Sequence, residues 1–549
     1  MTPPPKKIWR ILSGLLQRRP LLIILLAHTL FSIGIWNARD GYGEETNNVR
    51  MALHAVQSHR PDPFLYSDVI ALTLRYFTPD PVVALTLMKY LSSLIATVAL
   101  YLALSAFSGI LRKSAIVFAC LVWIASSLDA PYLQSTSLSL FTFAIMLFGI
   151  DCLLLRWSIA GVLGFYFFGL LAASLHPEYL VPVVLLTFFF AAQVVRQARL
   201  GWKVAICFAL PLGAVFWAHP PAPVLKKLKH LDNYALLGLG QCYADFYHRE
   251  HPETVFNPMT EYHDLLNREF NKPTGFCAAV ENNPREALRY FTLNAGRNLF
   301  WNVPSAFLDR YREQTARHHH GVLYWAVRGI LLAGALLGIA RLYRAGSKPI
   351  YNRFRNNPEG RGILLLLALL TTSFVAVILL VGTSRYYLCW APIFYLGVAY
   401  CADTLLRQFN LIRYEPQIIA VAFVVFCAPN FLSPRPNYEF DAVRHVAASV
   451  KEYPVIGASW AEPDAIIALD GKATAISLWD GIHHAAIENG KIDILLIDQN
   501  FRTSKTWADQ RDFFEHFERQ PETCGFKKAI GIPTGRFDIY YKPASIGPD

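Results

Sequence analysis

Three carboxylates lie within six positions near the start of the chain, at Asp40, Glu44 and Glu45. Gly41 and Gly43 between them permit a tight loop, because glycine adopts backbone conformations that other residues avoid. Carboxylates in a partly buried loop have raised pKa values and are candidates for a general base that takes a proton from a hydroxyl. Acidic residues in the first turn of a helix also complement its dipole. On these residues alone, base chemistry and helix capping both stay open.

A second group that suits chemistry is His176-Pro177-Glu178, in a short turn between two apolar runs. Imidazole nitrogen and carboxylate oxygen are ligands that divalent metals accept. His176 and Glu178, with Asp40 and Glu44, would form such a ligand set, or His176 and Glu178 would contact a substrate. A turn between two helices often contains proline in any case, so the group also fits a purely structural turn.

Two cations stand where an anionic group could be bound. Arg385 follows an apolar run and precedes Tyr386 and Tyr387, while Lys89 lies about two turns inside another run. The arginine fork suits phosphate, and a cation inside a membrane segment is a functional candidate by default. We expect both, with His176, to contact a phosphate. The alternatives are an arginine that reaches the lipid headgroups beside two interfacial tyrosines and a lysine that pairs with a carboxylate.

The elements that must position these residues are long apolar runs. The chain has 549 residues, of which 54% are hydrophobic and 17% are charged, against about 25% charged in soluble domains. A helix that crosses a bilayer needs about 20 apolar residues and satisfies its own backbone hydrogen bonds. The pattern predicts about 11 such helices, at 21–36, 82–106, 114–127, 137–155, 159–175, 179–195, 204–219, 321–340, 362–384, 386–405 and 415–432.

Lysine and arginine collect in one set of alternate loops, and the positive-inside rule makes these loops cytoplasmic. They include Arg18, Arg19, Arg112, Lys113 and Arg407, whereas the short loops 128–136 and 176–178 carry none. The N-terminus is therefore expected in the cytoplasm, and segments 37–81, 221–320 and 433–549 are expected outside. The first run is expected to be retained, because no small-x-small cleavage site follows it. The same rule accounts for the formal net charge of +11, and with no RNA- or DNA-binding motif we expect no nucleic-acid partner.

Segment 433–549 changes character, because helical and strand patterns alternate in it. These are a helix at 440–451, a short apolar run at 454–459, strands at 473–478 and 492–498, a helix at 507–517 and a strand at 537–541. Alternation of this kind predicts a small three-layer α/β domain. It has no GxGxxG and no P-loop, so no nucleotide site is assigned. We expect a transmembrane domain over 1–432, with outer loops 37–81 and 221–320, and an outer α/β domain over 433–549.

Cys242 and Cys277 share one long hydrophilic loop that the charge pattern places outside. Cysteines in an oxidising compartment form disulfides. We expect these two to pair.

The long first outer loop, which opens with an acidic motif and continues into amphipathic helices, resembles that of the GT-C class glycosyltransferases. The pattern is most similar to the lipid A aminoarabinose transferases and the protein O-mannosyltransferases, which open this loop with Asp-Glu. Here Glu44-Glu45-Thr46 stands eight residues ahead of Ala52, in the same register. The resemblance implies that Glu44 acts as the base on the acceptor hydroxyl, with Asp40 as second choice. Tyr66-Ser67-Asp68 stands where the aminoarabinose transferases carry Lys-Pro-Pro, so the lysine contact to phosphate has no counterpart here.

This resemblance implies a polytopic membrane enzyme of a bacterial inner membrane, with a periplasmic C-terminal domain. It would transfer a hexosyl or pentosyl group, with inversion, from a polyprenyl-phosphate donor to a glycan, lipid or protein hydroxyl. Membrane lipids are expected partners, and a divalent metal stays open as a cofactor. Two alternatives remain, a transporter or flippase of lipid-linked sugars and a non-enzymatic membrane scaffold. Against the transporter, the chain shows no internal repeat and no paired broken helices.

Overall fold

The computed structural model describes part of the chain, and each part is treated by itself. The described residues are 13–36, 53, 74, 76–105, 107–108, 111–127, 231–251, 262–298, 391–432, 438–450, 453–458, 469, 472–478, 483–502, 504–530 and 537–543. The chain divides into two compact units. The first comprises 1–36, 89–226 and 295–434, and the second comprises 37–88, 227–294 and 435–549.

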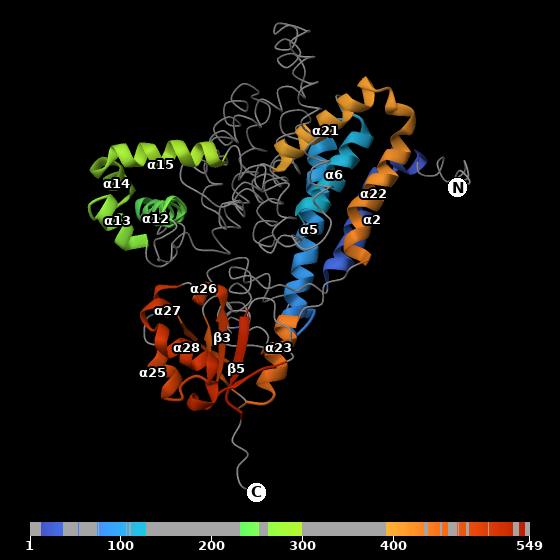
Figure 1. Ribbon diagram of the computed structural model, residues 1–549. Helices are drawn as coiled ribbons and strands as arrows, with labels where there is room; N and C mark the ends of the chain where they lie inside the picture. Colours follow the sequence, from blue (N-terminus) through green and yellow to red (C-terminus); the bar gives the residue numbers. More distant parts are fainter. Residues whose placement is uncertain are drawn as a thin grey trace, which may run out of the picture. The chain divides into compact units, whose positions relative to one another are not determined.

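The described part of the first unit is helical (Figure 1). Helix α6 packs against α2, α21 and α22, and α2 also packs against α22. Most of the buried side chains are apolar, with Trp123 and Tyr395 meeting edge to face at 5.6 Å. The elements are α2 (Pro20–Trp36), α5 (Pro81–Ser105), α6 (Lys113–Ser127), α21 (Ala391–Gln408), η6 (Leu411–Tyr414) and α22 (Glu415–Leu432). Residues 81–88 of α5 belong to the second unit and the rest of the helix to the first.

Buried polar side chains of this unit are joined by hydrogen bonds between helices. The Ser93 hydroxyl donates to the Tyr90 carbonyl at 3.0 Å, so it accepts the bond from His28 Nε2, also at 3.0 Å. Thr97 donates to the Ser93 carbonyl and accepts from Trp123 Nε1 at 3.0 Å. Unpaired polar groups in an apolar interior are costly, so these bonds fix α2, α5 and α6 in register.

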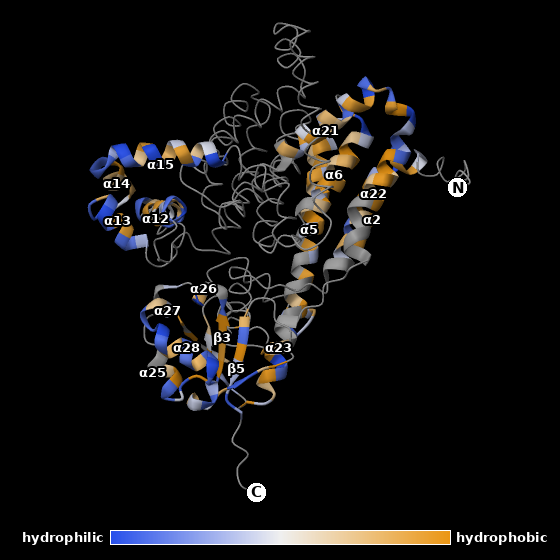
Figure 2. Ribbon diagram, viewed as in Figure 1, coloured by the Kyte–Doolittle hydropathy of each residue, from blue (hydrophilic) through white to orange (hydrophobic). Residues whose placement is uncertain are grey.

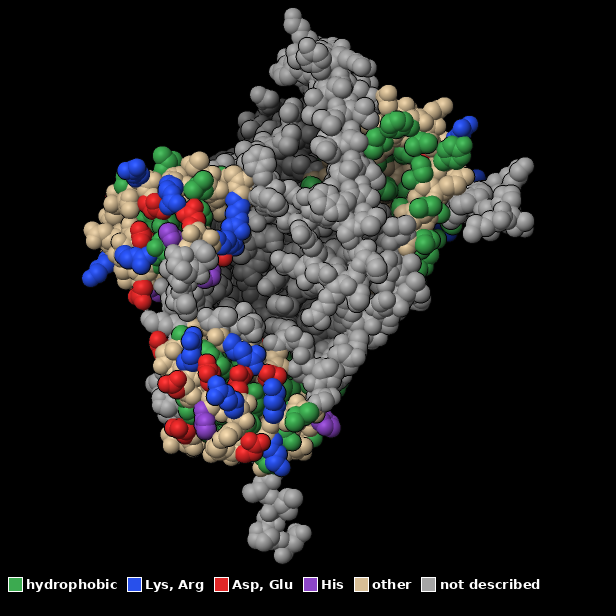
Figure 3. Space-filling model, viewed as in Figure 1, with side chains coloured by type: hydrophobic (Ala, Val, Ile, Leu, Met, Phe, Trp, Pro, Cys, Tyr) green, Lys and Arg blue, Asp and Glu red, His purple; other side chains and the backbone are tan. Residues whose placement is uncertain are grey.

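Large apolar side chains are also exposed along these helices, at one-turn spacing. They are Leu22 and Leu26 on α2, Leu91 and Ile95 on α5, and Val421 and Val424 on α22. Figure 2 shows α6, α21 and much of α5 as hydrophobic, and Figure 3 shows hydrophobic side chains gathered on the visible face of this unit. Among the described residues, no helix is long and apolar enough to cross a membrane. Six predicted runs, from 137–155 to 204–219 and at 321–340 and 362–384, lie outside the described residues, so the number of spans stays a prediction.

A helical group in the second unit is built from α12 (Leu231–Glu250), α13 (Tyr262–Glu269), α14 (Phe276–Asn282) and α15 (Pro284–Arg297). Its core is largely aromatic, with Tyr243, Phe270 and Tyr290 almost fully buried. Helix α12 comes close to α13 at Gly240, where an added Cβ would collide with the Tyr262 ring and lie 2.7 Å from Leu266.

The C-terminal segment forms a five-stranded mixed sheet in the order β2-β1-β3-β5-β4. β1 pairs in parallel with β2 and β3, whereas β5 is antiparallel to β3 and β4. The strands expected at 473–478, 492–498 and 537–541 are present. The strands are β1 (Val455–Ala458), β2 (Thr474–Ser477), β3 (Ile494–Asp498), β4 (Lys527–Lys528) and β5 (Phe537–Tyr541).

Helices cover this sheet on both sides (Figure 1). Side chains of α25, α27 and α28 form one core with β3 and β5, in which Trp507 stacks on Phe514 at 4.9 Å. Figure 1 shows α23 on the other side, where its residues Ala442, Val443 and Val446 are buried. The helices are α23 (Tyr438–Ala447), α25 (His483–Glu488), α26 (Gln499–Arg502), α27 (Lys505–Asp509) and α28 (Arg511–Arg519), with η7 at Pro521–Cys524.

Candidate functional site

Most residues that the sequence singles out for chemistry lie outside the described part of the chain. These are Asp40, Glu44, Glu45, His176, Glu178 and Arg385. Lys89 lies in α5, of which the backbone is described at that position. The arrangement of these side chains therefore stays a prediction. Within the described residues, no group of three or more His, Cys, Asp or Glu is placed to hold a metal ion.

The expected Cys242–Cys277 disulfide is wrong, because Cys277 is an exposed free thiol. Its backbone N–H donates to Asp232 Oδ1 at 3.1 Å, which places it at the first turn of α12. Cys242 lies ten residues after Asp232 in that helix, which corresponds to about 15 Å of helical rise. Disulfides require Cα atoms within about 7 Å. Two cysteines in the same loop need not be neighbours in space, because this loop folds into separate helices.

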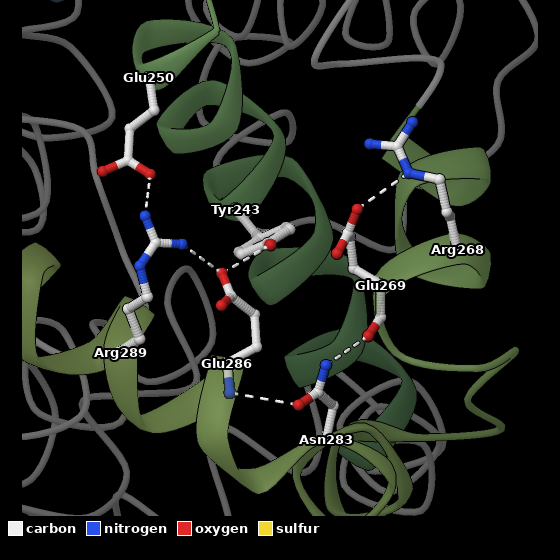
Figure 4. A network of polar contacts seen from close by, with 7 residues as sticks. All are labelled: Tyr243, Glu250, Arg268, Glu269, Asn283, Glu286 and Arg289. Carbon is white, nitrogen blue, oxygen red and sulfur yellow. Dashed lines mark hydrogen bonds and ion pairs between the residues drawn. The ribbon is translucent and has the colours of Figure 1, made fainter.

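A polar network joins the helices of the second unit and centres on Glu286 (Figure 4). The Tyr243 hydroxyl of α12 donates to Glu286 Oε1 of α15 at 2.9 Å. Arg289, one turn along α15, donates to the same oxygen at 2.8 Å. Its other nitrogen is hydrogen-bonded to Glu250 at the end of α12. Two helices are thus joined by one tyrosine, one arginine and two carboxylates.

Burial raises the pKa of the Tyr243 hydroxyl, and the hydrogen bond to Glu286 raises it further. The hydrogen bond to Glu250 raises the pKa of Arg289. Both groups therefore stay protonated and act as donors at neutral pH. A tyrosine in this state does not serve as a base.

The network continues through backbone groups to α13. Asn283 donates to the Glu269 carbonyl at 2.8 Å and accepts from the Glu286 N–H at 3.3 Å. Arg268 donates to the Glu269 carboxylate at 2.9 Å and lies over the Tyr247 ring at 5.1 Å. The donors and acceptors are largely matched with one another, so the network orders α12, α13 and α15 and offers no nucleophile. It is a positioning structure within the segment 221–320.

A charged cluster fastens one end of the first unit. Arg112 donates to Glu415 Oε1 at 2.8 Å and lies 3.6 Å from Asp403 Oδ1. Arg407 donates to the other Asp403 oxygen at 2.7 Å. Asp403 and Glu415 are 5% and 6% exposed. Buried carboxylates need such partners, because an unpaired buried charge is strongly destabilising.

The same end also includes the residues that precede α2. Lys113, next to Arg112, donates to the Gln17 carbonyl at 2.7 Å. Residues from the N-terminal stretch, the loop near 112 and the loop near 407 therefore meet. These are three of the stretches that the charge pattern assigns to one side of a membrane.

No family model and no curated protein matches the chain. The chain is similar to the archaeal oligosaccharyltransferase AglB from Archaeoglobus fulgidus, solved in complex with an inhibitory peptide and a dolichol-phosphate. The match has 12% sequence identity and a TM-score of 0.46, and it covers 88% of this chain and 70% of AglB. It is also similar to ArnT from Cupriavidus metallidurans bound to undecaprenyl phosphate, at 13% identity and a TM-score of 0.40, over 96% of this chain and 99% of ArnT. Both are GT-C glycosyltransferases.

Proposed function

We propose that the chain is a membrane glycosyltransferase that moves a sugar from a polyprenyl-phosphate donor to an acceptor hydroxyl at the outer face of a bacterial inner membrane. The donor's lipid tail lies among membrane helices, and its sugar faces outward. An enzyme on that side has no nucleotide sugar available, so a lipid-linked donor is the consistent substrate.

One observation carries this proposal. The charge pattern predicts that three separated segments lie on the same outer side, at 37–81, 221–320 and 433–549. The second compact unit is built from the cores of these same three segments. A channel or simple anchor needs no such unit, whereas an enzyme that joins a lipid-borne sugar to an outer acceptor does.

The proposed reaction is a single displacement. Glu44, or Asp40, takes the proton from the acceptor hydroxyl, whose oxygen bonds to the anomeric carbon as the bond to the phosphate oxygen breaks. The configuration inverts, and the polyprenyl phosphate leaves with the electron pair of that bond. Arg385, with Lys89 or His176, stabilises the charge that grows on the phosphate. Glu45 supports the base, and Glu178 with His176 is the pair that would hold a divalent metal.

A deletion strain tests the proposal. Loss of the enzyme should cause its lipid-phosphate sugar to accumulate in the membrane, and mass spectrometry of the lipid extract identifies it. The wild-type gene should clear this lipid, whereas Glu44→Gln should not, since loss of a general base slows transfer by about 10²–10⁴-fold. Asp40→Asn tests the second choice. Glu281→Gln, at an exposed acid of the second unit, is the matched control.

Full clearance by both Glu44→Gln and Asp40→Asn would remove these residues as the base. A flippase is distinguished by vesicles that contain the lipid-linked sugar and no acceptor, in which a flippase moves the lipid and a transferase leaves it unchanged. Chelation of divalent metal before the assay separates a metal-dependent reaction at His176 and Glu178 from a metal-independent one.

A further inference from the structure

One ion pair joins the C-terminal segment to the end of the first outer segment. Arg444 Nη2, on α23, donates to Asp80 Oδ1 at 3.1 Å, across 364 positions of sequence. Both residues belong to the second unit. The contact therefore links two stretches that the chain itself keeps far apart.

The same carboxylate begins α5. The Val83 N–H donates to Asp80 Oδ1 at 3.3 Å, and the Ala84 N–H donates to the Asp80 carbonyl at 2.9 Å. Pro81 is the first residue of the helix, a position where its fixed φ and missing N–H are tolerated. Asp80 is therefore the N-cap of α5, and one oxygen serves both the helix and Arg444.

Arg444 approaches from a helix that is itself well fixed. Its neighbours Ala442, Val443 and Val446 are each 2% exposed, so α23 is anchored by its buried side. The guanidinium is planar and directional. A fixed helix and a directional donor together determine where the first turn of α5 lies.

The place of this contact in the chain gives it functional meaning. Helix α5 follows the outer segment that carries the predicted bases, and Lys89 lies two turns further along it. Tyr76 and Phe77, just before Asp80, are 69% and 79% exposed. Exposed aromatic residues beside an apolar helix are typical of a membrane–water interface. The contact thus lies at the start of the helix that connects the first outer segment to the Lys89 position.

We propose that Arg444 is a positioning residue, through which the C-terminal domain holds the start of α5 and the end of the first outer segment in the geometry for sugar transfer. This rests on the proposed function of the chain. The pair touches no substrate, so its loss lowers kcat and leaves the acceptor KM unchanged. Since both side chains are about one-third exposed, the loss is about three- to fivefold.

A double-mutant cycle tests the proposal. Asp80→Asn removes the charge and keeps the cap, because asparagine caps as well as aspartate. Each of Asp80→Asn and Arg444→Gln should lower kcat about three- to fivefold, and the double variant should fall no further. Arg444→Lys should restore part of the rate. Arg519→Gln, at an arginine that is 76% exposed in the same domain, should leave kcat unchanged. Additive losses, or a rise in KM alone, would overturn the proposal.

A measurement that needs no activity separates this proposal from the function on which it rests. The variant with cysteines at both positions, Asp80→Cys with Arg444→Cys, is treated in membranes with a short bismaleimide, and the joined peptides are identified by mass spectrometry. If the double-cysteine variant cross-links but the wild type transfers no sugar, the proposed function is wrong and the contact between positions 80 and 444 is confirmed. Failure to cross-link would defeat the contact, whatever the activity.

Discussion

Replacing Arg112 by glutamine should destabilise the first unit measurably. The substitution leaves Asp403 and Glu415, 5% and 6% exposed, without their shared cation. Removing one partner of a fully buried ion pair costs about 3–5 kcal/mol. The Arg112 side chain is 34% exposed, so solvent screens part of this, and a loss of about 2–3 kcal/mol is expected. At about 2 °C per kcal/mol for a large protein, the melting midpoint should fall by about 4–6 °C.

The assay is thermal unfolding of the detergent-solubilised protein, followed by intrinsic tryptophan fluorescence. The double variant Arg112→Gln with Glu415→Gln should recover most of the loss, because Glu415 is the carboxylate that loses its cation, whereas Asp403 keeps its ion pair with Arg407. Arg413→Gln, at an exposed arginine in η6 close to Glu415, should change the midpoint by less than about 1 °C. An Arg112→Gln protein that melts with the wild type would refute the reasoning, since the buried carboxylates would then need no partner.

Three further predictions concern the second unit. The folded-state pKa of Tyr243 lies above the ordinary value, so the hydrogen bond to Glu286 stabilises the fold fully below about pH 10 and is lost as pH rises through the folded-state pKa. Tyr243→Phe should lower the free energy of unfolding by about 1–2 kcal/mol at neutral pH. In pH-dependent denaturation, this variant should not show the wild type's loss of stability at alkaline pH. An impermeant maleimide added to whole spheroplasts should label Cys277, and labelling should be slow at neutral pH because Asp232 raises the thiol pKa. Asp232→Asn should speed the labelling. If Cys277 is not labelled, the outer placement of this segment is contradicted. Gly240→Ala should cost about 1–3 kcal/mol by overpacking in urea unfolding, whereas Gly238→Ala, with nothing within 4 Å of an added Cβ, should be neutral or stabilising.

The strands of the C-terminal segment could be predicted because their burial is local in sequence. β3 is buried at all five positions, and a continuous apolar run is the signature of a strand covered on both faces. The edge strand β4 could not be predicted, because its residues Lys527 and Lys528 are exposed and pair only because β5 lies beside them. Charged residues at an edge are a common protection against further pairing. The antiparallel direction of β5 depends on the loop that returns it, which pattern alone does not give.

The helices α12 to α15 were missed, although part of the signal was present. Leu239, Tyr243 and Phe246 recur at helical spacing, and all three are buried. A search for aliphatic stripes overlooks them, because two of the three are aromatic and carry neighbours such as Asp245. The expected helix at 507–517 is two helices, because Ser504 caps the first and the chain breaks at Gln510 before α28 begins.

Contacts such as Arg112 with Glu415 could not be predicted as pairs. They join positions 303 residues apart, and nothing in either local sequence specifies the other. Positions that the charge pattern assigns to one side of a membrane do meet at one end of the described helices, while the side itself stays a prediction. The Cys242–Cys277 prediction failed because two residues of one loop can lie far apart in space, here along a helix of several turns.

One face of α5 is turned towards its neighbouring helices. Ser93 bonds to His28 and Thr97 to Trp123, so this face meets α2 and α6. The opposite face carries Leu91 and Ile95, each 39% exposed. The polar residues of this apolar run therefore face inward, because their hydroxyl groups find hydrogen-bond partners there and an unpaired polar group in an apolar interior is costly.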